Sequence, residues 1–336
     1  MGSHKIAPIP PREGRAALGK LIDIVILGWV YDSRPTEEIG TEFSQPTRQP
    51  IGEVSASELQ QPLGAIASGT SSFGPQAQWS TWYHYLLGAV LPRSHESFVS
   101  YLLEDLVVGF MALYPNGVYR EPYEGSRDDA LMTLGRCMMD TECWNGSNIA
   151  IGRILRRSDN NPNRVWVWWD ASGDFTASMF FCLKYLPESL VAPWLRSVLE
   201  ITSPHWRAQV IVWMVGAHDI LKGAVKWPSE FREDARPSVA WEWSHCLRPE
   251  LSAADSSGAA LTVAFIPEAS RSQALQTFQS YFVEEVYLDW LTSISTVPYL
   301  EAELAEIPAA FEKLYVCRRS IVQPSALRRT RNADDR

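Results

Sequence analysis

Helical patterns, bounded by capping and terminating residues, follow one another along most of this chain and limit its possible folds. The clearest pattern runs from Ser203 to Gly223, with Pro204 at the first helical position. One face of this helix is apolar by the i, i+4, i+7 spacing: Trp206, Val210, Trp213, Met214, Ala217 and Leu221. Comparable patterns predict further helices over 94–114, 126–144, 174–185, 188–201, 270–293, 298–305 and 308–318.

Breakers, caps and strand signals refine this picture. Pro193 is expected to kink or restart the helix over 188–201, and Ser270 with Gln273 forms a capping box for the helix over 270–293. Strand composition is confined to two stretches, 165–169 and 261–265. We therefore predict a mainly α fold of antiparallel helix pairs with at most one small β element. An irregular α-superhelix is one arrangement of such pairs, although no fixed internal period supports a repeat.

Composition divides the 336 residues into four segments. Residues 1–31 contain an apolar run that predicts a buried helix, and this run is too short to span a bilayer. Residues 32–78 are rich in Gly, Pro, Ser, Thr and Gln, so we expect irregular structure there. We expect residues 79–318 to form the helical main domain and the basic tail over 319–336 to be disordered.

The charge and cysteine content exclude several classes of protein. The formal charge of −9 makes nucleic acid an unlikely partner, because such binding relies on neutralising phosphates. Five cysteines without a C-x-x-C pair predict reduced thiols in a cytoplasmic protein rather than disulfides or a zinc site. Since 46% of the residues are apolar, the chain has ample material for a core.

The familiar signatures of nucleotide, hydrolase and zinc sites are absent: no P-loop, G-x-G-x-x-G, G-x-S-x-G or H-E-x-x-H occurs. Asp159, Asn161, Asn163 and Asp170 have the spacing of a calcium loop, but Arg164 replaces the required glycine. A polar turn is the preferred interpretation of these residues. We therefore predict neither a metal nor a cofactor.

Two groups of residues could carry acid–base chemistry. Asp170 and Asp174 follow Trp166 and Trp168, whose rings share one face of a strand and could bind a sugar, a base or a cation. A carboxylate pair of this type suits a glycosidase, whereas packing in the core is the competing interpretation.

The second group lies on the helix over 203–223. His218 and Asp219 are an acid–base pair by residue type, although adjacent helical residues diverge by about 100° and do not touch. His205 and Arg207 could hold an anion at the start of the same helix. The competing interpretations are a histidine favoured by the helix dipole at position 218 and a solvated one at position 205.

The chain also contains 14 tryptophans, and aromatic residues dominate both cores and binding surfaces. Trp241, Trp243 and His245 lie on one side of the chain if that segment is extended, and could line a binding surface. A buried connector is the alternative interpretation.

Three hypotheses of function follow. The first is a cytoplasmic protein-binding module, such as an adaptor, scaffold or neutralising partner, with an aromatic-rich, acidic helical surface and a large apolar patch. The second is an all-helical, hydrolase-like enzyme, which requires at least three of the five acid–base candidates to converge in one pocket. The third is a structural subunit that self-assembles through residues 1–78.

Overall fold

The computed structural model describes residues 55–73, 77–90, 102–118, 127, 130–131, 134, 144–145, 148–149, 171, 173–202, 204–232, 234–254, 264–296, 305 and 307–316. Within these residues the fold is mainly α, as predicted. The one β element described is a hairpin, in which β1 (Trp144–Asn145) pairs antiparallel with β2 (Asn148–Ile149). Every helix among the described residues is too short or too polar to span a lipid bilayer.

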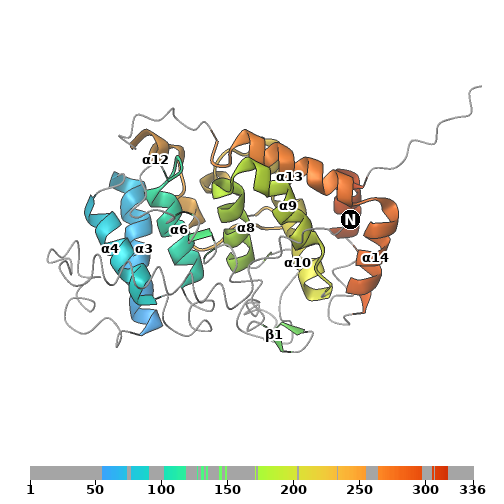
Figure 1. Cartoon of the computed structure of the whole chain (residues 1–336), viewed down its shortest axis with the longest axis horizontal. Coiled ribbons are helices and arrows are strands. Elements are labelled where there is room, and N and C mark those ends of the chain that lie inside the picture. The colour runs from blue at the N-terminus through green and yellow to red at the C-terminus, as the bar shows by residue number, and fades with distance from the viewer. Residues whose placement is uncertain are drawn as a thin grey trace, which may run out of the picture.

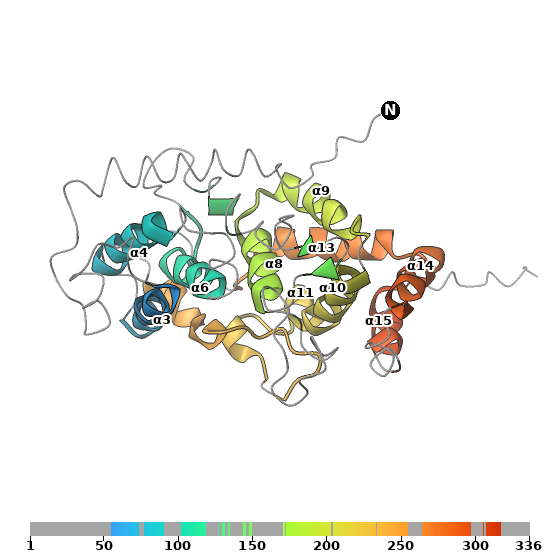
Figure 2. The ribbon, with the colours of Figure 1, turned by 90° about the horizontal axis from the view of Figure 1, so that it is seen from below.

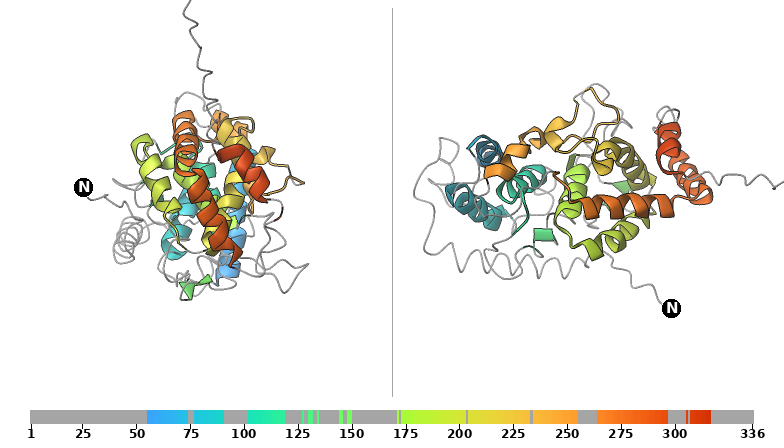
Figure 3. Two further views of the ribbon diagram at one scale, coloured as in Figure 1. Left: turned by 90° about the vertical axis from the view of Figure 1, so that its right-hand side faces the viewer. Right: turned by 90° about the horizontal axis from the view of Figure 1, so that it is seen from above.

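The helices lie along an elongated body (Figure 1). The longer ones are α3 (Ala56–Phe73), α4 (Ala77–Val90), α6 (Leu103–Leu113), α8 (Gly173–Tyr185), α9 (Glu188–Leu199), α10 (Pro204–Gly216), α13 (Glu268–Tyr281), α14 (Glu284–Ser295) and α15 (Ile307–Tyr315). Short helices complete the described set: α11 (His218–Lys222), η6 (Pro228–Glu230), η7 (Ser244–Cys246) and α12 (Pro249–Ala254). The first and last long helices lie at opposite ends of the body (Figure 3).

A single apolar core joins these helices. α6 packs between α3 and α8, α13 lies against α9 and α11, and α10 contacts α14 and α15. Aromatic side chains form much of this core, and the largest that are fully buried are Trp82, Trp206, Trp213, Trp227 and Trp290. Only Trp194 and Trp243 are half-buried among the tryptophans whose side chains are described, so most of these described tryptophans serve packing.

The segment after α11 returns along one side of the molecule toward α3 (Figure 2). On this path η7 contacts both α3 and α6, and α12 packs on α3. The return brings Glu242 into hydrogen-bonding contact with Glu104, although the two residues are 138 positions apart in the sequence. This long-range contact creates the site described below.

The expectation of irregular structure over 32–78 is wrong for the residues that form α3. Ser55 and Glu58 form a capping box at its start: the Ser55 N–H donates to Glu58 Oε2 at 2.8 Å, and the Glu58 N–H donates to Ser55 Oγ at 3.3 Å. Its apolar face is fully buried: Leu59, Leu63, Ile66 and Ala67. The small residues that suggested a loop allow close packing, since two glycines of α3 lie against tryptophan rings.

The helix predicted over 203–223 is divided into α10 and α11. α10 ends at Gly216, where a Cβ atom would lie 2.7 Å from the Val239 side chain and 2.9 Å from the Pro237 carbonyl oxygen. The returning segment therefore passes directly over this break. α11 ends at Gly223, whose φ of 83° is a conformation that glycine adopts without strain.

The helix predicted over 270–293 also forms two helices, α13 and α14. α13 begins at Glu268, so Ser270 is a buried residue within it rather than its cap. The chain leaves the helix at Phe282, whose ring is fully buried against Trp290 and Phe311. The break between α13 and α14, which the local pattern did not predict, therefore coincides with the burial of Phe282.

The remaining predictions of helices and strands are confirmed in part or concern residues outside the described ranges. The helices expected over 174–185 and 188–201 correspond to α8 and α9, and Pro193 lies inside α9 without restarting it. Phe265, from one predicted strand, lies in a bend. The other predicted strand, the N-terminal segment over 1–31 and the tail over 319–336 fall outside the described residues.

Candidate functional site

The first acid–base group cannot be assembled from the described side chains. Asp170, Trp166 and Trp168 lie outside the described residues. Asp174 lies in α8 and His205 lies in α10, but only the backbone of these two residues is described. Convergence of the five acid–base candidates therefore stays a prediction.

His218 connects α11 to α15. The Tyr315 hydroxyl donates to the Met214 carbonyl oxygen at 2.8 Å, so its oxygen accepts a hydrogen bond from His218 Nδ1 at 3.0 Å. Burial lowers the pKa of His218, which favours its neutral form. The neighbouring Asp219 is exposed. This geometry gives His218 a role in holding two helices together.

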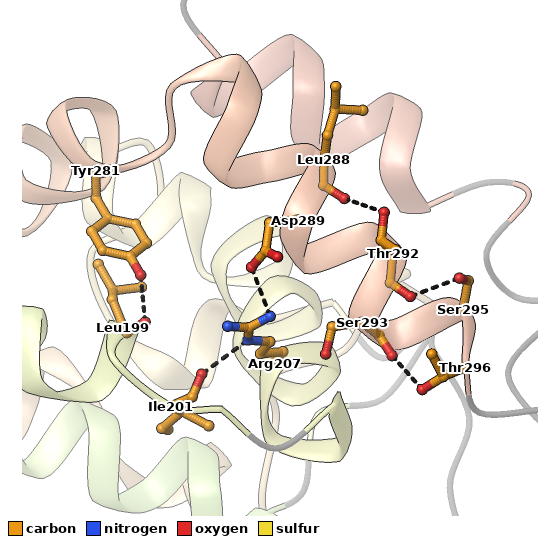
Figure 4. A network of polar contacts seen from close by, with 10 residues as sticks. All are labelled: Leu199, Ile201, Arg207, Tyr281, Leu288, Asp289, Thr292, Ser293, Ser295 and Thr296. Carbon is orange, nitrogen blue, oxygen red and sulfur yellow. Dashed lines mark hydrogen bonds and ion pairs between the residues drawn. The ribbon is translucent and has the colours of Figure 1, made fainter.

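Arg207 is engaged within the protein (Figure 4). Its Nε donates to the Ile201 carbonyl oxygen at 2.9 Å, and its Nη1 pairs with Asp289 Oδ2 at 3.0 Å. The guanidinium also lies 5.3 Å from the centre of the Trp290 ring. These contacts fasten the start of α10 to α14 and engage the Arg207 guanidinium, one of the two side chains that we expected to bind an anion.

The segment that contains Trp241, Trp243 and His245 is not extended, so the condition under which all three would share one side is not met. Trp243 has a φ of 62°, in the left-handed region, and η7 begins directly after it. Trp241 is buried and stacks on Phe180 with ring centres 5.4 Å apart. Trp243 and His245 stack on each other at 5.9 Å, with the histidine exposed.

Trp243 rests on α3 at a place where only a glycine fits. A Cβ atom on Gly64 would lie 2.5 Å from a carbon of the Trp243 ring. The indole is half-buried, and its N–H makes no well-formed hydrogen bond. Its backbone conformation is unusual for a residue with a side chain, and such conformations gather at functional positions.

Two carboxyl groups from the first turn of α6 lie close to this segment: Asp105 interacts with the Trp243 indole and Glu104 with the Glu242 backbone. Glu104 and Asp105 are buried, with 3% and 0% of their surfaces exposed. Glu104 Oε2 accepts a 2.6 Å hydrogen bond from the backbone N–H of Glu242, and its carboxyl carbon lies close to Gly173 at the start of α8. Glu104 is therefore stabilised by neighbouring N–H groups and helix N-termini.

Asp105 lies in the same first turn of α6 but accepts no hydrogen bond comparable to that of Glu104. Neither of its oxygens makes a well-formed hydrogen bond, and the Trp243 indole and the Asp105 backbone N–H act on it only as weak donors. Burial raises its pKa to about 8, with further contributions from the negative charges of Glu242 and Glu104, while the Trp243 indole acts in the opposite direction. At neutral pH Asp105 is therefore mostly protonated, and a nearby cation would favour its ionised form.

We call Glu104, Asp105, Glu242, Trp243 and His245 the acidic tryptophan site. It combines three carboxyl groups with an aromatic ring that reaches solvent, and this combination attracts an organic cation. No group of three histidine, cysteine or acidic side chains suited to a metal ion occurs among the described residues.

Sequence reasoning found Trp243 and His245 but missed the two carboxyl groups behind them. Glu104 and Asp105 are adjacent charges in a helix that was expected to be central because it is apolar nearly all round. Buried charges are rare without a partner, so this pair was a usable signal.

A second missed group is Lys184, near the end of α8. Its Nζ donates to the carbonyl oxygens of Pro115 at 2.6 Å and Phe265 at 2.8 Å. Burial lowers its pKa to about 7. Both acceptors are backbone groups, so Lys184 ties α8 to two neighbouring loops.

Comparison of this chain with protein-family models, with curated proteins and with solved structures gave no match. The acidic tryptophan site therefore has to be interpreted from its own geometry.

Proposed function

We propose that the protein is a protein-binding module that recognises a basic segment of another protein at the acidic tryptophan site. The observation that carries this proposal is Asp105, a buried carboxyl group that makes no well-formed hydrogen bond, beside the half-buried Trp243. Such a group is costly to keep in a folded protein unless a partner compensates it. An adaptor, scaffold or neutralising partner would use the site in this way.

Charge supports this proposal more than apolar area does. The chain carries a formal charge of −9, which attracts basic partners over long range. Only three large apolar side chains are exposed among the described residues: Leu190, Val283 and Leu288. The large apolar patch expected from the sequence is therefore not found in the described part of the chain.

The position of the described tryptophans narrows the aromatic part of the proposed surface. Most of them are buried, which leaves Trp243 as the aromatic ring of this site. The free thiols of Cys182 and Cys246 are consistent with a reducing compartment, so we include a cytoplasmic location in the proposal.

Fluorescence anisotropy with a dye-labelled peptide tests this function. The probe is a short peptide in which lysine alternates with glycine, compared with the same peptide carrying acetylated lysines. We expect the charged peptide alone to bind, and to bind more weakly as salt is added.

Trp243→Phe should weaken that binding roughly tenfold, because phenylalanine attracts a cation less strongly than tryptophan does. Trp194→Phe is the matched control, since Trp194 is also half-buried but lies on α9. No binding of the lysine peptide, or equal binding by the Trp243 variant, would overturn the proposal.

A further inference from the structure

The state of Asp105 suggests how the acidic tryptophan site distinguishes a cation from other ligands. Asp105 is fully buried, and neither oxygen makes a well-formed hydrogen bond beyond weak donation from the Trp243 indole and its own backbone N–H, so it has unused capacity to pair with a charged donor. This inference rests on the proposed function and specifies the group that the site recognises.

We propose that a lysine side chain of the partner enters beside Asp105, pairs with its carboxylate and displaces the carboxyl proton to solvent. In this step the O–H bond of Asp105 breaks, the proton passes to water or buffer, and an ammonium–carboxylate pair forms. A compact ammonium group on a slim apolar stem suits a route past an indole ring.

The groups around Asp105 determine the direction of this exchange. Glu104 on α6 and Glu242 on the returning segment are both acidic, and both oppose a negative charge on Asp105. α3 contributes Gln60, a neutral side chain whose amide donates to Glu242 at 3.5 Å. No cation is among the described groups that shift the pKa of Asp105. A cation supplied by the partner would therefore favour the ionised form of Asp105.

In the proposed entry, the lysine passes the two neighbours of Asp105 that reach solvent. Glu242 is exposed and Trp243 is half-buried, whereas Glu104 is buried. Trp243 therefore has to turn aside when a lysine enters. Its ring is held on one side by contact with Gly64 and on a face by the exposed His245.

Calorimetry of the full chain with the lysine–glycine peptide tests this inference without relying on a variant. The titration is run near pH 7 in two buffers with different ionisation enthalpies. Because Asp105 is mostly protonated in the free protein, we expect release of close to one proton per bound peptide.

Asp105→Asn should release no proton and bind the peptide roughly tenfold more weakly, since the amide keeps the shape but cannot become a carboxylate. Glu250→Gln is the control for loss of one acidic side chain, because Glu250 is exposed on α12. This control should bind and release the proton as the unaltered protein does.

The outcomes separate this inference from the proposed function. Peptide binding without proton release, or with equal release by Asp105→Asn, would overturn the inference and leave the binding function standing. If the lysine peptide does not bind, both fail. Tight binding of a free polyamine in place of the peptide would overturn the assignment to a lysine of a partner protein.

Discussion

At the scale of single residues, two buried titratable groups make folding stability depend on pH in opposite directions. Burial raises the pKa of Asp105 to about 8 and lowers the pKa of Lys184 to about 7. In the unfolded chain these groups titrate near pH ~3.9 and ~10.4. The folded state thus retains a proton on Asp105 that the unfolded state loses, and it loses a proton on Lys184 that the unfolded state retains.

We predict that the free energy of unfolding of Asp105→Asn falls less between low and high pH than that of the unaltered protein. The folded pKa is above the unfolded value, so the contribution of Asp105 is fully present below about pH 4 and is lost as pH rises through about 8. Urea unfolding at about pH 5 and about pH 9 compares the two proteins. Equal changes in the free energy of unfolding would contradict the burial of this carboxyl group.

Lys184→Met should have the reverse effect. Since the folded pKa of Lys184 is below its unfolded value, the lysine makes stability rise with pH between about 7 and 10, and methionine abolishes that rise. The variant should also lose about 1–3 kcal/mol, because the Pro115 and Phe265 carbonyl oxygens lose their donor. Lys222→Met, at an exposed site on α11, is the control in the same unfolding experiment.

At the scale of helices, α3 depends on its first turn. Ser55 is its N-terminal cap, so Ser55→Ala should lower the free energy of unfolding by about 1 kcal/mol. Ser72 is an exposed serine near the other end of the helix, and its replacement by alanine should have little effect. Equal effects of the two substitutions in urea unfolding would argue against the capping role.

The end of α9 depends on side chains from other helices. Tyr281 donates to the Leu199 carbonyl oxygen at 2.7 Å, and Arg207 donates to that of Ile201 (Figure 4). Arg207→Met should therefore cost about 1–3 kcal/mol, whereas Asp289→Ala should cost less than about 1 kcal/mol because the aspartate side chain is 68% exposed. Comparable losses in both variants would show that the ion pair, rather than the bond to α9, holds these helices.

At the scale of the whole molecule, local patterns predicted the helical class but not the breaks and joins between elements. The pattern over 174–201 resolves into α8 and α9 because caps and prolines act within a few residues. The end of α10 is different. Gly216 lies against Pro237 and Val239, which follow it by about twenty residues, so no local pattern marks this end. α3 was missed because its small residues suggested a loop, although the capping box was present.

The candidate site shows the same division between local and long-range information. Trp243 and His245 were found by residue type, but the turn at Trp243 that separates them from Trp241 has no clear local signal. The meeting of Glu242 with α6 depends on the return of the chain, which periodicity does not encode. A buried acidic pair in a central helix was the available clue.

The most direct test of the account is a pH titration of the Asp105 carboxyl carbon by NMR, with its signal assigned through its loss in Asp105→Asn. We predict a midpoint near pH 8 in the free protein, and a midpoint well below pH 7 when the lysine–glycine peptide is bound. A midpoint near pH ~4 in the free protein, the ordinary value for an aspartate, would contradict the buried, unpaired carboxyl group on which the binding site depends.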